Sequence, residues 1–139
     1  MESRLARSSD DILAELRELH DTLSKLVAAA PQSPPGENEI WLLYARSERL
    51  AAVLKFRLGV ERPGVFLKLP RSEKPEEFLP RALEGLEDAI AALEAKKELD
   101  GLESMRSART SLRAYLAEKR RARMRAKRRA SAASRPSSS

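Results

Sequence analysis

The chain has 139 residues, 27 of them Lys or Arg and 21 Asp or Glu, which gives a net charge of +6. It contains no cysteine, which excludes disulfides, thiolate metal sites and thiol nucleophiles. No apolar run approaches the ~20 residues that cross a bilayer. The length suits one domain with a modest core, and six aromatic residues make that core mainly aliphatic. The first residues show no hydrophobic signal segment, so we expect a cytoplasmic protein.

Positive charge is concentrated near the C-terminus. From Met1 to Leu116 there are 18 basic and 20 acidic residues, so the body is almost neutral. The segment 117–130 contains one acid, Glu118, and eight cations: Lys119, Arg120, Arg121, Arg123, Arg125, Lys127, Arg128 and Arg129. This asymmetry indicates an appended basic arm with an anionic partner. Abundant charge with little Asn or Gln is also typical of thermophile proteins, although a GC-rich genome would enrich Arg and Ala as well.

The body shows four helical patterns in chain order. Residues 9–30 carry a heptad-like apolar seam that ends before Pro31. A second helix is predicted over 39–58, apolar on more than one side, with Asn38 as its cap. A short turn at 75–79 precedes a third helix over 80–99, and Asp100–Gly101 predicts the break before a fourth. Residues 65–69 alternate in hydropathy, which fits an extended loop or a single strand.

These patterns predict an all-α fold, a small antiparallel helical bundle of about four helices, with an extended basic C-terminal helix or tail. We assign residues 1–8 to a flexible N-terminus, 9–116 to the bundle, 117–130 to a basic helical arm and 131–139 to a disordered Ser-rich tail. The narrow seams favour coiled-coil-like packing, within the chain or against a second copy.

The segment 117–130 is rich in Ala, Arg and Lys, which favour helix. Its cations recur at i,i+4, and such like-charge pairs destabilise a helix by a few tenths of a kcal/mol each. We therefore expect this segment to be a frayed helix in the free protein and a stable helix when a bound anion neutralises its charge. Polyphosphate fits that role because guanidinium groups grip phosphate bidentately. If about five to eight charges engage, log K falls with log salt at a slope of roughly −4 to −7.

The arm itself offers little for reading a base sequence. It contains no aromatic side chain to stack on bases and no Asn or Gln to read adenine edges. The expected contact is therefore with the phosphate backbone of DNA or structured RNA and largely independent of sequence. A different acidic partner, a membrane surface, a transport signal and a passive solubility tail are the alternatives.

Two further groups of residues are candidates for binding. Arg109 and Arg113 follow Arg106 at one-turn spacing, so they extend the basic stripe or, alternatively, pair with acids such as Glu94, Glu98 or Glu103. Trp41 and Tyr44 form either a partner interface or part of the core.

The residues needed for catalysis or metal binding do not occur together. His20 is the only histidine and has no second ligand at i±3 or i±4, so we read it as a boundary residue. Glu84, Glu87, Asp88 and Glu94 read as a solvated face rather than as a carboxylate metal site. There is also no glycine-rich phosphate loop. We expect no enzyme activity, no metal and no cofactor.

The function that fits best is a non-enzymatic accessory protein that binds nucleic acid through its basic arm. The alternative is a protein–protein adaptor or a small assembly subunit of a nucleoprotein complex, including a capsid or packaging role, with the tail secondary. A protein partner or a homodimer is compatible with either.

Overall fold

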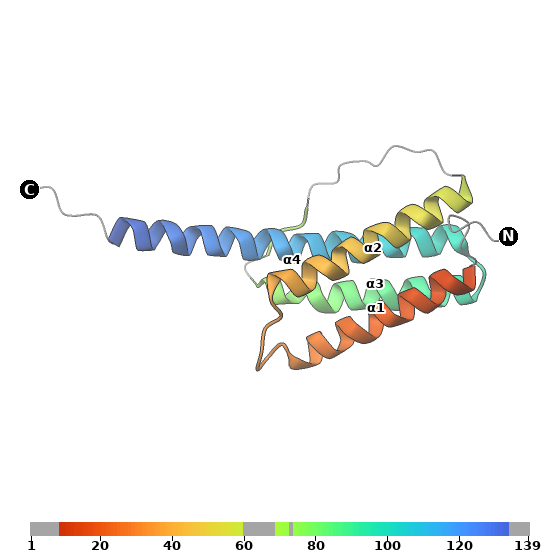
Figure 1. Ribbon diagram of the computed structural model, residues 1–139, viewed down its shortest axis with the longest axis horizontal. Helices are drawn as coiled ribbons and strands as arrows, with labels where there is room; N and C mark the ends of the chain where they lie inside the picture. The colour runs from red at the N-terminus through yellow and green to blue at the C-terminus, as the bar shows by residue number, and fades with distance from the viewer. Residues whose placement is uncertain (1–8, 60–68, 73, 134–139) are drawn as a thin grey trace, which may run out of the picture.

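The computed structural model describes residues 9–59, 69–72 and 74–133, and within these ranges the chain is all-α (Figure 1). The elements are α1 (Ser9–Ala29), α2 (Glu37–Leu58), the short 3-10 helix η1 (Pro75–Glu77), α3 (Phe78–Glu94) and α4 (Glu98–Ala133). The predicted helical bundle is thereby confirmed. The predicted flexible N-terminus 1–8, residues 65–68 of the predicted extended segment 65–69, and residues 134–139 of the predicted Ser-rich tail lie outside the described residues.

The four helices form a bundle in which spatial neighbours run antiparallel (Figure 1). α4 packs against α2 and α3, and α1 packs against the same two helices from the other side. α2 and α3 run in the same direction at diagonal corners. Because α2 has 22 residues and is about 33 Å long, the chain must return that distance before α3 begins. A long connection between α2 and α3 is therefore a consequence of the topology.

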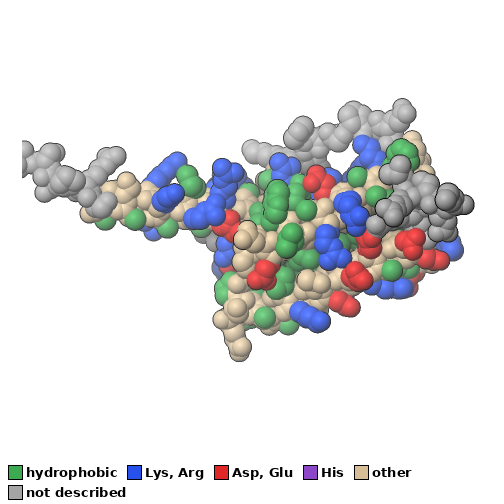
Figure 2. Space-filling model, in the orientation of Figure 1, with side chains coloured by type: hydrophobic (Ala, Val, Ile, Leu, Met, Phe, Trp, Pro, Cys, Tyr) green, Lys and Arg blue, Asp and Glu red, His purple; other side chains and the backbone are tan. Residues whose placement is uncertain are grey.

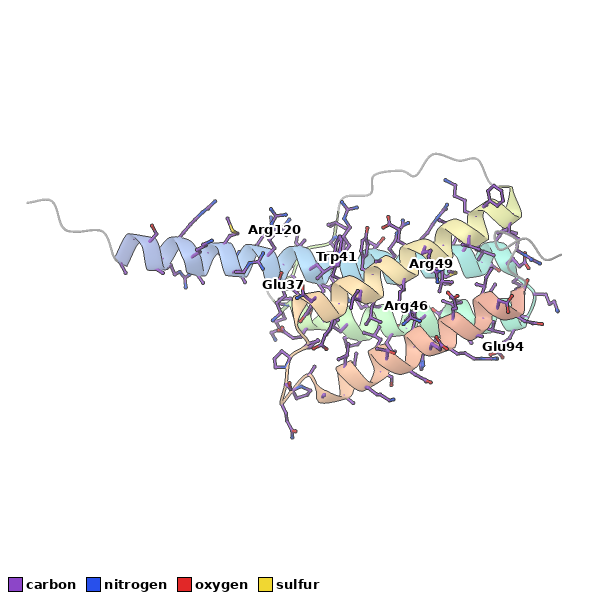
Figure 3. The ribbon with its side chains drawn as sticks, in the orientation of Figure 1. Glu37, Trp41, Arg46, Arg49, Glu94 and Arg120 are labelled. Carbon is purple, nitrogen blue, oxygen red and sulfur yellow. The ribbon has the colours of Figure 1, made fainter. Side chains whose placement is uncertain are left out.

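The core is mainly aliphatic, as the composition predicts. The α1 seam contributes Ile12, Leu16, Leu19 and Leu23, all at most 1% exposed. Ion pairs also link the surface of α1 to α2 and α3. Arg46 and Arg49 on α2 reach Glu18 and Glu15, while Arg17 reaches Glu94 on α3 (Figure 3). Such exposed pairs contribute about 0–1 kcal/mol each, so the aliphatic seam decides the packing.

The turn between α3 and α4 differs from the expectation. The predicted break at Asp100–Gly101 is wrong, because both residues lie inside α4. The chain turns at Ala95–Lys97 instead, where Lys96 takes a left-handed conformation at φ 62°. Gly101 is buried, and a Cβ there would lie 2.9 Å from a methyl carbon of Leu93. The glycine therefore serves close helix packing rather than a turn.

The boundaries of the other helices also shift slightly. α2 begins at Glu37 with Gly36 in the N-cap position and no side-chain cap hydrogen bond, so the prediction that Asn38 caps it is wrong. α3 begins at Phe78 and ends at Glu94, rather than spanning 80–99. Gly59 ends α2 in a left-handed conformation, as its position at the end of the pattern predicts.

We expect Gly85→Val to destabilise the bundle at a close contact between α3 and α4. A Cβ at Gly85 would lie 3.0 Å from both the backbone nitrogen and the Cβ of Ala108. Valine adds two more carbons there, and overpacking of this kind costs about 1–3 kcal/mol. Urea denaturation followed by circular dichroism measures the loss. Glu84→Val places the same side chain on an exposed neighbour as the control; equal stability of the two variants would contradict the close α3–α4 contact.

Candidate nucleic-acid interface

The basic arm is the continuation of a bundle helix. α4 is a single helix of 36 residues, about 54 Å long, that includes 117–130 and continues to Ala133. Its N-terminal half packs in the bundle, and its C-terminal part projects beyond the ends of α2 and α3 (Figure 1). Figure 2 shows Lys and Arg side chains along this projection, whereas basic and acidic side chains are interspersed on the visible face of the body. The expectation that the arm frays without an anion stays a prediction.

The first part of the arm, Tyr115–Arg123, which we call the arm root, is held by acids. Lys119 Nζ lies 3.1 Å from Glu76 of η1, and Arg123 Nη1 lies 2.9 Å from Glu37 of α2. Glu118 is only 5% exposed and accepts a hydrogen bond from Arg121 at 2.6 Å. The guanidinium of Arg71 lies 3.4 Å from the same Glu118 carboxylate. Three of the eight arm cations are therefore neutralised by the protein itself.

Tyr115 anchors the arm root to the connector that precedes α2. Its side chain is fully buried, and its hydroxyl donates a hydrogen bond to the carbonyl of Pro35, in the connector before α2. Lys119 Nζ lies 5.6 Å from the centre of the tyrosine ring. Burial raises the pKa of Tyr115 to about 12, and the charges of Glu76, Glu37 and Glu39 act in the same direction. The pKa of Glu76 is lowered, first by a backbone hydrogen bond and further by Lys119.

The cations further along α4 differ from those of the arm root. We call Met124–Ala133 the outer arm; it contains Arg125, Lys127, Arg128 and Arg129, all exposed. Within the part of the chain that the structure describes, none of these four, nor Arg120, has an acidic partner. Five cations are therefore available for an external anion. Like-charge repulsion along the arm is relieved at the root and remains in the outer arm.

The two predicted arginines upstream of the arm lie on the body of α4. Arg109 is half-buried and Arg113 is exposed. The alternative pairing with Glu94 or Glu98 is not seen among the described residues, because those acids contact Arg17 and Arg57 instead. Arg113 lines a groove described next, and Arg109 does not.

Trp41 and Tyr44 face an open groove between α2 and α4, which we call the α2–α4 groove, of about 1230 Å³. Tyr44 is 8% exposed and belongs to the core, whereas Trp41 is 56% exposed. Their ring centres are 5.3 Å apart with the planes tilted by 34°. The opposite wall includes five arginines of α4: Arg113, Arg120, Arg121, Arg125 and Arg128. Figure 3 shows Trp41 and Arg120 near each other where α4 leaves the bundle.

The α2–α4 groove combines a basic wall with an aromatic surface. Its described lining contains five arginines against two carboxylates, Glu37 and Glu48, and Glu37 is already paired with Arg123. Asn38 also lines the groove, one turn before Trp41. The groove can therefore offer an anion several guanidinium groups, a flat apolar ring and an amide.

The sequence does not reveal this association. Arg120 is far along the chain from Asn38 and Trp41, and the only available signal is that Asn38 and Trp41 share one helical face at i,i+3. The prediction that the arm has no aromatic of its own holds for 117–130. The fold nevertheless brings Trp41 of α2 to the side of the arm root.

The described residues give little support to a metal site, to a role of His20 in catalysis or to a membrane span. His20 is partly exposed and lies 3.0 Å from Glu87 across the α1–α3 contact, a boundary position. In the described ranges, no three His, Cys, Asp or Glu side chains lie together as a metal site would require. None of the helices there has the length and apolarity of a membrane span.

Comparison of the chain with protein-family models, with curated proteins and with solved structures finds no match.

Proposed function

We propose that this protein is a non-enzymatic accessory protein that binds nucleic acid through the phosphate backbone, using the cations of its basic arm. The observation that carries the proposal is the division of the arm into a root, where Lys119, Arg121 and Arg123 are paired internally, and an outer arm, whose cations have no acidic partner among the described residues. Arg125, Lys127, Arg128 and Arg129 are held on a helix that extends away from the body into solvent. Phosphate chains are the polymeric anions that such a row of guanidinium groups fits best.

The contact expected of the outer arm is independent of base sequence. A helix with cations around its circumference follows phosphates without presenting a defined set of hydrogen-bonding groups to base edges. The four cations of the outer arm together with Arg120 predict a salt slope of about −4.5, which corresponds to roughly a 500-fold loss of affinity between 50 and 200 mM salt.

The test is fluorescence anisotropy with labelled duplex DNA and structured RNA at several salt concentrations. The full chain is compared with a chain that ends after Arg123, which keeps the three internal ion pairs of the arm root. We expect tight, salt-sensitive binding by the full chain and its loss in the shortened one. Equal binding by both chains, or no binding by either, would contradict the proposal.

A second function, that of a protein–protein adaptor or assembly subunit, is supported by a different observation. α2 exposes Leu42 by 64% and Phe56 by 77%, in addition to Trp41. Exposed large apolar side chains along one helix favour a surface that meets another protein or a second copy. Light scattering of Leu42→Ser and Phe56→Ser against the unchanged chain tests self-association, since loss of an oligomer in both variants would favour this function.

A further inference from the structure

Trp41 is exposed, which is unusual for a large aromatic residue in a chain that contains only six aromatic residues. More than half of its surface is exposed, although Tyr44, three residues on, is in the core. The Tyr44 ring lies behind it at 5.3 Å between centres, so the indole is supported on one side and open on the other. Nothing about core packing requires an exposed indole here. A flat, supported ring facing an open groove is the arrangement that stacks on another flat ring.

The arginines of the opposite wall determine what kind of ring would be accepted. Arg120, Arg125 and Arg128 line the α2–α4 groove and have no acidic partner among the described residues. An apolar peptide seated there would take these guanidinium groups out of water without a counter-charge, which is costly. The occupant must therefore carry negative charge at short intervals beside a flat ring.

We propose that the α2–α4 groove binds single-stranded nucleic acid, with an unpaired base stacked on Trp41 and the adjoining phosphates held by the arginines of α4. A polynucleotide strand supplies one phosphate for every base, which matches an aromatic floor beside a basic wall. The proposal rests on the function proposed above and adds the form of nucleic acid that the protein prefers. Duplex DNA satisfies the outer arm but hides the faces of its bases, so it gains nothing from Trp41.

This assignment extends what the arm does alone. The outer arm binds any phosphate chain, whereas the groove favours one whose bases are free. The two surfaces overlap at Arg125 and Arg128, which belong to the outer arm and also line the groove, so a strand that leaves the groove passes directly onto the outer arm. Asn38 lines the groove one turn from Trp41 and adds an amide within the same surface.

The test uses the full-length protein and Trp41→Ala, with fluorescently labelled oligo-dT and a blunt DNA duplex carrying the same number of phosphates. Loss of one stacked base is expected to weaken oligo-dT binding by about 5- to 150-fold. Duplex binding is expected to change by less than about twofold, because removal of an indole leaves every phosphate contact in place. Trp41→Phe keeps an aromatic face and is expected to recover part of the affinity for oligo-dT.

Leu99→Ala is the matched control, since Leu99 is a large exposed apolar residue of α4 that does not line the groove. It is expected to leave both affinities unchanged. Because Trp41 is the only tryptophan, the unchanged protein also provides a direct signal: oligo-dT should quench its fluorescence to saturation and the duplex should not. Circular dichroism confirms that each variant is folded.

Three outcomes are distinguishable. No binding of either probe by the unchanged protein would overturn the function proposed above, and this inference with it. Binding of both probes with no effect of Trp41→Ala would leave the arm as a phosphate-binding element and overturn the groove. Quenching by poly-glutamate as strong as that by oligo-dT would overturn the assignment to nucleic acid and identify an acidic protein segment as the occupant.

Discussion

Replacing the four cations of the outer arm by glutamine is expected to weaken nucleic-acid binding on the order of a thousandfold at about 0.1 M salt. The residues are Arg125, Lys127, Arg128 and Arg129. Each engaged cation contributes about 0.9 to the salt slope, so the slope should decrease in magnitude by about 3.6. Glutamine favours helix and removes like-charge repulsion, so the shape of α4 is retained. Anisotropy titrations over a salt series measure both quantities.

A second variant, with the same net charge as the arm variant, separates the effect of where the cations lie from the effect of net charge. Lys25, Lys55, Lys96 and Lys97 lie on the body of the bundle, outside the arm, and their replacement by glutamine also removes four positive charges. Long-range attraction falls equally in the two variants, but only the arm variant loses contacts with phosphate. We expect the body variant to bind within about tenfold of the unchanged protein, with nearly the same slope. Equal losses in the two variants would mean that the arm has no special role.

The helices were predictable because their information is local. The spacing of Ile12, Leu16, Leu19 and Leu23 predicts one buried face, and the structure buries all four. Proline and glycine at the ends of the patterns placed most predicted helix boundaries within a few residues of those in the structure. The bundle class follows from four such amphipathic segments, which can bury their faces only against one another.

The position of one turn was not predictable, because it is decided by contacts between helices. Asp100–Gly101 is a turn signal when read locally, but Gly101 lies against Leu93 across the α3–α4 interface. A side chain at that point would separate the two helices. The turn occurs instead at Lys96, a residue with no strong turn preference, because the hairpin requires the reversal at that level of the bundle.

The candidate site shows the same division between local and long-range information. The cations of the arm are visible in the sequence as a charge run. Their separation into paired and unpaired groups depends on Glu37 and Glu76, which are far from the arm in sequence and close in space. The groove arises in the same way, because it needs Trp41 of α2 beside Arg120 of α4. Sequence periodicity identifies a face of a helix, but it does not identify which helix lies opposite.

Tyr115→Ala is expected to lower the free energy of unfolding by about 3–5 kcal/mol, the cost of removing a fully buried aromatic side chain. The ring lies between α4 and the connector before α2, and the Lys119 ammonium nitrogen is 5.6 Å from its centre. Tyr115→Phe keeps the ring and removes only the hydrogen bond to Pro35, so we expect a loss of about 0.5–1.5 kcal/mol. Urea denaturation measures both values, and equal losses would mean that the ring does not hold the arm root.

The pH dependence gives an independent test of the same contact. The pKa of Tyr115 is about 12 in the folded protein, above the ordinary tyrosine value of 10.0. The folded state therefore holds the phenolic proton more firmly than the unfolded state does. The stability that this proton contributes is complete below pH 10 and is lost as the pH rises towards 12. Tyr115→Phe has no such proton, so the stability difference between the unchanged protein and this variant should shrink over that range. A difference that stays constant up to pH 12 would show that the hydroxyl is exposed to water and that the arm root is not anchored at Pro35.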